Sequence, residues 1–157
     1  MAETEFIVYV VDDDDSVRAS LKLLIESSGY HVVAFRSAED FLDSSFGESP
    51  CCLVLDIHLP GMSGFNLQGH LVKSQTRIPV IFITGHDRYR MEDEAMRLGA
   101  IAYLRKPFDE QYLLDAIHAL REGEEGDRDA EAAPAKRAQT STSTARSSGS
   151  NFTGSTT

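Results

Sequence analysis

The sequence has no hydrophobic run that approaches the roughly 18 apolar residues of a membrane-spanning helix. Its start also lacks the basic and then apolar segment that is typical of a secretion signal. Apolar residues make up 41% of the chain, slightly less than is usual for a globular protein. We therefore expect a cytoplasmic protein, and 157 residues are enough for one domain with a hydrophobic core.

Positive charge is also scarce. The chain carries 15 Lys and Arg residues against 25 Asp and Glu residues, a formal net charge of −10. Residues 122–157 hold six acids and four bases, so −8 of this charge belongs to residues 1–121. Direct binding to nucleic acid or to an anionic membrane needs clustered Lys and Arg, and the composition argues against both. An acidic body instead favours a divalent cation or a basic partner surface.

Only two cysteines occur, and they are the neighbours Cys51 and Cys52. Neighbouring residues in a strand point to opposite faces of a sheet, so a bridge between them would be badly strained. We interpret both as buried thiols in a reducing compartment rather than as a disulfide.

Five apolar, β-rich runs alternate with segments of helical periodicity. The expected strands are residues 5–11, 31–35, 52–56, 79–85 and 101–104. The second helical segment is expected over residues 39–43. Apolar residues at helical spacing mark the other four: Val17, Leu21, Leu24 and Ile25 in the first; Leu67 and Leu71 in the third; Met91, Ala95 and Leu98, before Gly99, in the fourth; and Leu113, Ala116, Ile117 and Leu120 in the fifth. Such alternation predicts an α/β fold with parallel strands and right-handed crossovers.

Polar residues stand where these apolar runs stop. Asp12 and Asp13 follow the first run, Asp56 ends the third, Thr84 ends the fourth and Lys106 follows the fifth. In an open α/β sheet the carboxyl ends of the strands form one edge, and ligands bind there. We therefore expect these five side chains to make one site.

The residue types suggest what the site does. Three converging carboxylates repel one another, and a hard cation such as Mg²⁺ with oxygen ligands relieves that repulsion. Lys106 supplies a point cation for a phosphate or carboxylate, and Thr84 supplies a hydroxyl donor. A carboxylate nucleophile at Asp56 with these groups favours phosphoryl transfer.

Four motifs in this order resemble those of response-regulator receiver domains over about residues 5–121. They are Val10-Val11-Asp12-Asp13, Leu55-Asp56-Ile57-His58-Leu59-Pro60-Gly61-Met62-Ser63-Gly64, Ile83-Thr84-Gly85-His86 and Lys106-Pro107-Phe108. The third motif, taken with Glu94-Ala95-Met96-Arg97-Leu98-Gly99-Ala100, resembles the FixJ-type branch. The resemblance implies a flavodoxin-like, doubly wound, five-stranded parallel sheet of strand order 2-1-3-4-5 with five helices.

The resemblance also assigns roles by position. It implies that Asp56 is phosphorylated by a sensor histidine kinase or a histidine phosphotransfer protein. Asp13, Asp56 and the backbone carbonyl of His58 would bind Mg²⁺ directly, and Asp12 would act through water. The protein would be a signalling switch rather than an enzyme, with only Mg²⁺-dependent self-phosphorylation and autodephosphorylation.

For signalling, the resemblance implies that Thr84 and Lys106 contact the phosphoryl oxygens and that Tyr103 is the aromatic switch residue. The Lys106–Pro107 bond is expected to be cis, a state that X-Pro bonds permit. Phosphorylation would change the face formed by the fourth helix, fifth strand and fifth helix, which would bind a downstream protein or a second copy of the chain. Exposed candidates on that face are Arg90, Glu94, Arg97 and Arg105.

Several neighbouring residues have simpler interpretations. Asp14 and Asp15 begin a helix, where carboxylates cap amide donors, so we assign them as caps rather than ligands. Ser37 is expected to cap the second helix. His58 and His86 lie close to Asp56 and Thr84 in sequence, and an influence on the lifetime of the phosphoryl group is favoured over direct chemistry.

Two other functions compete with the switch. An aspartate-nucleophile phosphatase needs a second acid two residues after its nucleophile, where this chain has His58. The chain could also be the receiver half of a truncated DNA-binding regulator, although residues after Arg121 lack the apolar periodicity of a helix-turn-helix. We expect a receiver domain over residues 1–121 and a disordered Ser/Thr-rich tail or truncated linker over 122–157.

Overall fold

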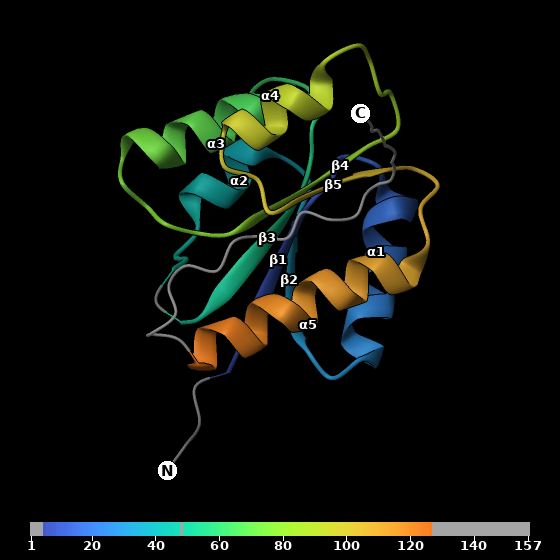
Figure 1. The fold of residues 1–157 in the computed structure, drawn as a ribbon, viewed down its shortest axis with the longest axis vertical. Coiled ribbons are helices and arrows are strands. Elements are labelled where there is room, and N and C mark those ends of the chain that lie inside the picture. The colour runs from blue at the N-terminus through green and yellow to red at the C-terminus, as the bar shows by residue number, and fades with distance from the viewer. Residues whose placement is uncertain (1–4, 48, 127–157) are drawn as a thin grey trace, which may run out of the picture.

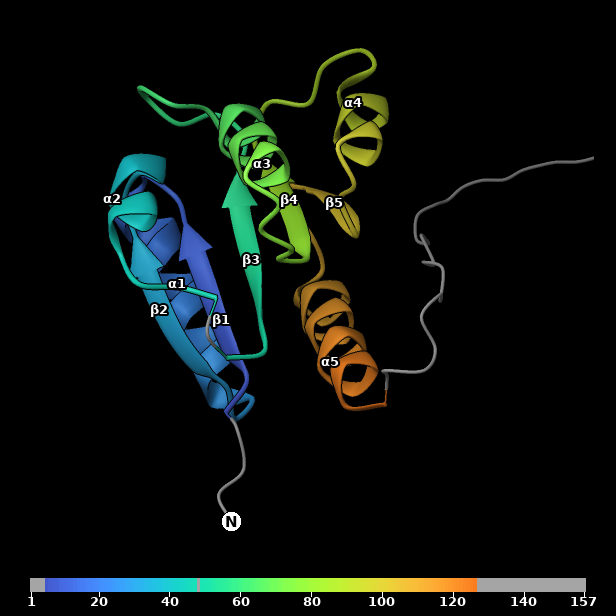
Figure 2. The same cartoon turned by 90° about the vertical axis from the view of Figure 1, so that its left-hand side faces the viewer.

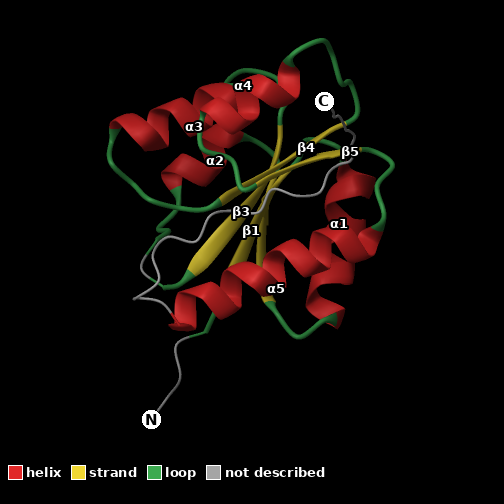
Figure 3. Cartoon of the chain, viewed as in Figure 1, coloured by secondary structure: helices red, strands yellow, loops and turns green. Residues whose placement is uncertain are grey.

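Five strands and five helices alternate along the chain in the computed structural model, which describes residues 5–47 and 49–126. The strands are β1 (Ile7–Val11), β2 (His31–Phe35), β3 (Cys51–Asp56), β4 (Val80–Thr84) and β5 (Ala102–Arg105). The helices are α1 (Asp15–Ser27), α2 (Ala38–Asp43), α3 (Gly64–Lys73), α4 (Met91–Arg97) and α5 (Glu110–Gly126). Figure 3 colours the two kinds of element separately.

All strand pairs are parallel, and their order across the sheet is β2-β1-β3-β4-β5. Figure 2 shows this order from one edge of the sheet to the other. The flavodoxin-like fold and its strand order are therefore confirmed. The ends of β1, β3, β4 and β5 differ from the expected ones by one or two residues, because strand ends depend on ladder hydrogen bonds rather than on the apolar pattern.

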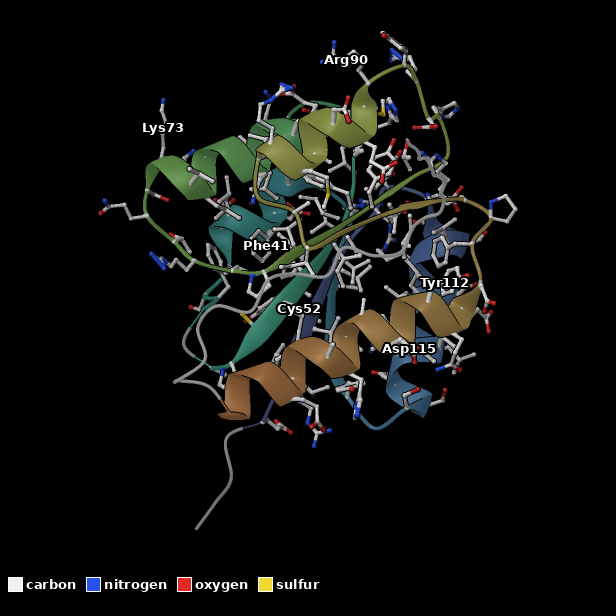
Figure 4. The ribbon with its side chains drawn as sticks, viewed as in Figure 1. Phe41, Cys52, Lys73, Arg90, Tyr112 and Asp115 are labelled. Atoms are coloured by element: carbon white, nitrogen blue, oxygen red, sulfur yellow. The ribbon has the colours of Figure 1, made fainter. Side chains whose placement is uncertain are left out.

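Helices cover both faces of the sheet, with α2, α3 and α4 on one side and α1 and α5 on the other (Figure 1). Each side has its own hydrophobic core. Cys51 packs in the core under α2–α4, and Cys52 packs in the core under α1 and α5. Figure 4 shows Phe41, fully buried, between α2 and the sheet. The inner strands β1, β3 and β4 are buried almost throughout, as their continuous apolar runs predict, whereas the edge strands β2 and β5 are only partly buried.

Side-chain caps start α1, α2 and α3. Asp14 caps α1 by accepting from the amide of Val17, and Ser37 caps α2 by accepting from the amide of Asp40. Ser63 caps α3 in the same way. The predicted capping roles of Asp14 and Ser37 are confirmed, and Asp15 lies in the first turn of α1.

Helix α5 continues past Arg121 to Gly126. The predicted tail of residues 122–157 otherwise lies outside the described residues. None of the helices in residues 5–47 and 49–126 combines the length and the apolar character needed to cross a membrane.

Candidate functional site

The polar residues singled out by the sequence lie at the C-terminal edge of the sheet. Asp56 is the last residue of β3 and Thr84 the last of β4. Asp12 and Asp13 directly follow β1, and Lys106 directly follows β5. Because all five strands are parallel, these positions meet at one edge, with the central strands β1 and β3 next to each other.

Three carboxylates form the centre of the site. Asp12, Asp13 and Asp56 each offer one carboxylate oxygen, and these atoms lie within 4.8 Å of one another. The side chain of Asp12 is fully buried, Asp56 is 5% exposed, and Asp13 is exposed to solvent. The cluster is therefore open to solvent at Asp13 and closed to solvent at Asp12 and Asp56.

Lys106 provides the positive charge opposite this cluster. Its Nζ atom lies 3.1 Å from Oδ2 of Asp12 and 4.0 Å from Oδ2 of Asp56. The Lys106–Pro107 peptide bond is cis, as predicted. One cation facing three carboxylates leaves the cluster with excess negative charge.

Burial and charge act together on Asp56. The pKa of Asp56 is raised to about 6, mainly by the loss of solvent around its carboxyl group and next by the neighbouring charge of Asp12. The charge of Lys106 and a hydrogen bond from the amide of His58, 3.3 Å from Oδ1, oppose this shift. The carboxylate of Asp56 is thus poorly stabilised by the protein alone, which suits a group that gains a cation or forms a covalent bond.

The acidic pocket fits a hard divalent cation. All its donors are oxygens, the buried Asp12 has one lysine as its ion-pair partner among the described residues, and the exposed Asp13 leaves room for water. These features match the preference of such ions for a few carboxylates together with retained water molecules.

Thr84 connects the sheet edge to the loop that follows β4. Its side chain is fully buried, and Oγ1 accepts a hydrogen bond from the amide of His86 at 3.0 Å. A hydroxyl oxygen that accepts one hydrogen bond still has its own proton to donate. In the sheet ladder, Ile83 pairs with Asp56, so Thr84 stands one residue beyond the level of the central carboxylate.

The two histidines near the site contact each other across its rim. Nε2 of His58 lies 3.2 Å from the backbone oxygen of His86, and the two rings meet edge to face with centroids 5.3 Å apart. Among the described residues, neither imidazole ring belongs to the group of side chains that could hold a metal ion. Their expected influence on the lifetime of the phosphoryl group stays a prediction.

Tyr103 lies on β5, opposite Phe82 of β4 in the ladder, and is 8% exposed. Its hydroxyl donates to Oδ1 of Asp87 at 2.5 Å. The sequence did not identify Asp87 as a site residue, because its partners Tyr103 and Arg105 are 16 and 18 residues away and the loop before α4 has no periodic pattern.

Other residues near the site were also missed as site residues. Arg18 donates from Nη1 to the backbone oxygen of Asp12 at 2.9 Å. Glu39 accepts from the amide of Met62 at 2.9 Å and so holds the loop after β3. Gly64 lies directly against the backbone of Asp56 and Ile57. The motif containing Gly64 was visible in the sequence, but Arg18 and Glu39 had only the charge expected of exposed helix residues.

The exposed charges named on the face of α4 and β5 take part in ion pairs. Arg97 lies 3.2 Å from Glu94, and Arg90 lies 3.6 Å from Asp93. Arg105 contacts both Asp87 and Glu92 at 2.8 Å. Figure 4 shows Arg90 at the start of α4, on the side away from the sheet.

Comparison with known proteins agrees with this arrangement. The family model described as "Response regulator receiver domain" matches residues 8–118. Nodulation protein W of Bradyrhizobium diazoefficiens is 47% identical over 130 residues, which cover 83% of this chain and 57% of that protein. Transcriptional regulatory protein FixJ of the same organism is 39% identical over 118 residues, covering 74% of this chain and 58% of that protein.

Solved structures give the same result. The response regulator StyR is 47% identical with a TM-score of 0.72, over 77% of this chain and 62% of that one. The crystal structure of FixJ-N is 36% identical with a TM-score of 0.67, over 78% of this chain and 96% of that one. The chain spans about half the length of the curated relatives it matches.

Proposed function

Because this chain belongs to the response regulator receiver domain family of two-component systems, we propose that it accepts a phosphoryl group on Asp56 from a histidine kinase or a histidine phosphotransfer protein. The observation that carries the proposal is the position of Asp56. Its carboxylate lies between the acidic partners Asp12 and Asp13 and the ammonium group of Lys106.

The acidic pocket is proposed to hold Mg²⁺. Asp13, Asp56 and the backbone carbonyl of His58 would bind the ion directly, and the buried Asp12 would bind it through water. When bound, the ion supplies positive charge that neutralises carboxylate and phosphoryl oxygens. The support for this assignment is the cluster of three carboxylates within 4.8 Å, together with the raised pKa of Asp56.

In the proposed reaction a carboxylate oxygen of Asp56 attacks the phosphorus of a phosphohistidine in line with the leaving nitrogen. The new O–P bond forms as the P–N bond breaks, and the imidazole leaves with its bonding electron pair and takes up a proton. Lys106 pairs with one phosphoryl oxygen, and the Thr84 hydroxyl donates to another. The same residues support self-phosphorylation by small acyl phosphates and autodephosphorylation.

A groove beside the site suits the phosphoryl donor. It has a volume of about 290 Å³ and lies between α1 and the loop from β5 to α5. Its apolar lining comes from Val17, Leu21, Leu24, Pro107 and Phe108, and Lys106 also lines it. A helix of a cytoplasmic kinase or phosphotransfer protein that places apolar side chains in this groove would bring its phosphohistidine towards Asp56.

The output is proposed to be a change in α4, β5 and α5. A phosphoryl group adds about −1.5 to −2 charges beside Thr84, which moves towards it. This movement opens space that Tyr103 can enter, and the surface carrying Arg90, Glu94, Arg97 and Arg105 then binds a downstream protein or a second copy of the chain.

The direct test uses a small acyl-phosphate donor with Mg²⁺ and intact-mass measurement. Wild type should gain one phosphoryl group, and a chelator should abolish the gain. Asp56→Asn should gain none, while Asp115→Asn, a matched change of an exposed carboxyl on α5, should behave like wild type. Equal phosphorylation of Asp56→Asn would contradict the assignment.

A second candidate is that the chain is the receiver half of a DNA-binding transcriptional regulator. It is favoured by the relatives named transcriptional regulatory proteins, of which the chain spans little more than half. The discriminating measurement is phosphorylation-dependent DNA binding by the product of the complete gene compared with this chain. A complete product that is no longer than this chain would rule the candidate out.

A further inference from the structure

One carboxylate in the loop between β4 and α4 holds two side chains of β5 at once. Oδ1 of Asp87 accepts from the Tyr103 hydroxyl at 2.5 Å, and Oδ2 accepts from Nε of Arg105 at 2.8 Å. Tyr103 and Arg105 point to the same face of the sheet, since they are two residues apart in one strand. The guanidinium of Arg105 also lies over the Tyr103 ring, 5.3 Å from its centroid.

The loop that carries Asp87 begins at the phosphorylation site. Thr84 ends β4, and its Oγ1 accepts from the amide of His86, the residue directly before Asp87. The Thr84 hydroxyl is therefore linked to Asp87 through one hydrogen bond and the short stretch of backbone from His86 to Asp87. A movement of Thr84 towards a phosphoryl group pulls on the segment that places Asp87.

The same contacts extend to helix α4. Arg105 donates from Nη2 to Glu92 at 2.8 Å, and Glu92 lies in the first turn of α4. Asp87, Arg105 and Glu92 thus connect the loop after Thr84 with the buried Tyr103 of β5 and with the start of α4.

The electrostatics of the group agree with its geometry. Partial burial would raise the pKa of Asp87, but the hydrogen bonds from Tyr103 and Arg105 outweigh it and lower this pKa. Burial, followed by the bond to Asp87, raises the pKa of the Tyr103 hydroxyl. The bond to Asp87 is the main cause that raises the pKa of Arg105.

We propose that Asp87 is a positioning residue that couples Thr84 to Tyr103 and Arg105, and that it holds Tyr103 in the buried arrangement which phosphorylation of Asp56 favours. This inference rests on the proposed function. Because coupling between two sites is reciprocal, an arrangement that phosphorylation stabilises must in turn favour the phosphorylated state. In this proposal the phosphoryl group is accepted from that arrangement, so the rate of phosphorylation follows its population.

Stabilisation of the folded state does not account for this group of contacts. The side chains of Arg105, Asp87 and Glu92 are 54%, 35% and 41% exposed in their ion pairs, and ion pairs at such positions contribute little to the free energy of unfolding. Its distinctive property is that it connects the buried hydroxyl of Tyr103 to the loop that begins at Thr84.

The test compares Asp87→Ala, Asp87→Asn, Tyr103→Phe and the double variant Asp87→Ala/Tyr103→Phe. The first quantity is the rate of phosphorylation by a small acyl phosphate at fixed Mg²⁺. The second is the NMR signal of the isotopically labelled Tyr103 ring before and after phosphorylation. Asp93→Asn is the matched control, because Asp93 is an exposed acid of α4 outside the group and pairs with Arg90.

Asp87→Ala should slow phosphorylation by roughly fivefold, at the low end of coupling between sites. Asp87→Asn should restore part of the rate, because its amide oxygen can still accept from Tyr103 although the charge that holds Arg105 is gone. The double variant should be no slower than Asp87→Ala, because the two side chains act through one hydrogen bond. The Tyr103 signal should change its response to phosphorylation in Asp87→Ala but not in Asp93→Asn.

Independent effects of Asp87→Ala and Tyr103→Phe that multiply in the double variant would overturn the inference. So would an Asp87→Ala protein that behaves like Asp93→Asn. If Asp87→Ala fails to fold, the same comparison with Asp87→Asn decides the question. A wild-type protein that takes up no phosphoryl group would refute the proposed function itself, and this inference with it.

Discussion

Gly64, the first residue of α3, lies against the backbone of Asp56, the last residue of β3. A Cβ atom at position 64 would overlap the carbonyl oxygen of Asp56 and would lie 2.9 Å from Cα of Ile57. The amide of Gly64 also donates to the backbone oxygen of Ile57 at 2.9 Å. The position of Asp56 thus depends on the absence of a side chain at position 64 in the next helix.

Gly64→Ala is therefore expected to displace the strand end and to lower the free energy of unfolding by about 1–3 kcal/mol, the usual cost of overpacking. It should also slow phosphorylation of Asp56. The control is Gly69→Ala in the same helix, where a Cβ meets nothing within 4 Å and should add about 0.5–1 kcal/mol of stability. Urea unfolding and acyl-phosphate kinetics measure both effects, and equal behaviour of the two variants would contradict the close contact.

The raised pKa of Asp56 predicts how the stability of the metal-free protein depends on pH. In the unfolded chain this carboxyl titrates near 3.8, and in the folded chain it titrates at about 6. Between these values the folded state keeps a proton that the unfolded state has released. Stability therefore falls as pH rises through this window, by roughly 3 kcal/mol from this group.

Asp56→Asn should remove this loss, so the variant should be more stable than wild type above pH 6 in the presence of a chelator. Mg²⁺ should restore wild-type stability without affecting the variant to the same extent. Urea unfolding between pH 4 and pH 8, with and without Mg²⁺, tests the prediction. Parallel pH profiles for the two proteins would show that burial of Asp56 carries no such cost.

Replacement of Lys106 tests whether phosphorylation of Asp56 can be separated from the change at Tyr103 that follows it. Lys106→Gln should still be phosphorylated on Asp56, but it should fail to change the environment of Tyr103, because no ammonium group pairs with the phosphoryl oxygen. Intact mass and the Tyr103 NMR signal measure the two steps separately. A variant with a normal Tyr103 response would remove Lys106 from the switch.

Arg97 tests the proposed output face. Its ion pair with Glu94 is exposed, so Arg97→Glu should change the stability by less than about 1 kcal/mol and leave phosphorylation unaltered. Binding of a downstream protein, or self-association of the phosphorylated chain in sedimentation, should weaken. Lys22→Glu reverses a comparable exposed pair on α1 and should leave this association intact. Loss of association in both variants would indicate a general charge effect.

The alternation of strands and helices could be predicted because the strands are apolar runs and four of the five helices have a clear periodicity. The second helix was expected from its Ser37 cap instead, and the strand order came from the resemblance to receiver domains. The site residues could be located because parallel strands bring Asp12, Asp56 and Lys106 to one edge. The contact of Asp87 with Tyr103 could not be predicted, since it depends on the path of an irregular loop. The same holds for Glu39, whose bond to the amide of Met62 joins two segments that are 23 residues apart.

The opposite orientations of Cys51 and Cys52 have a practical consequence. Both residues are buried in hydrophobic cores on opposite sides of the sheet, and burial raises the pKa of the Cys52 thiol far above its usual value. A maleimide probe applied to the native protein will react at an engineered surface cysteine and spare the two natural ones. Fluorescent or spin labels can therefore be attached next to α4 without first replacing either native residue, in a chain that also has no tryptophan to obscure the signal.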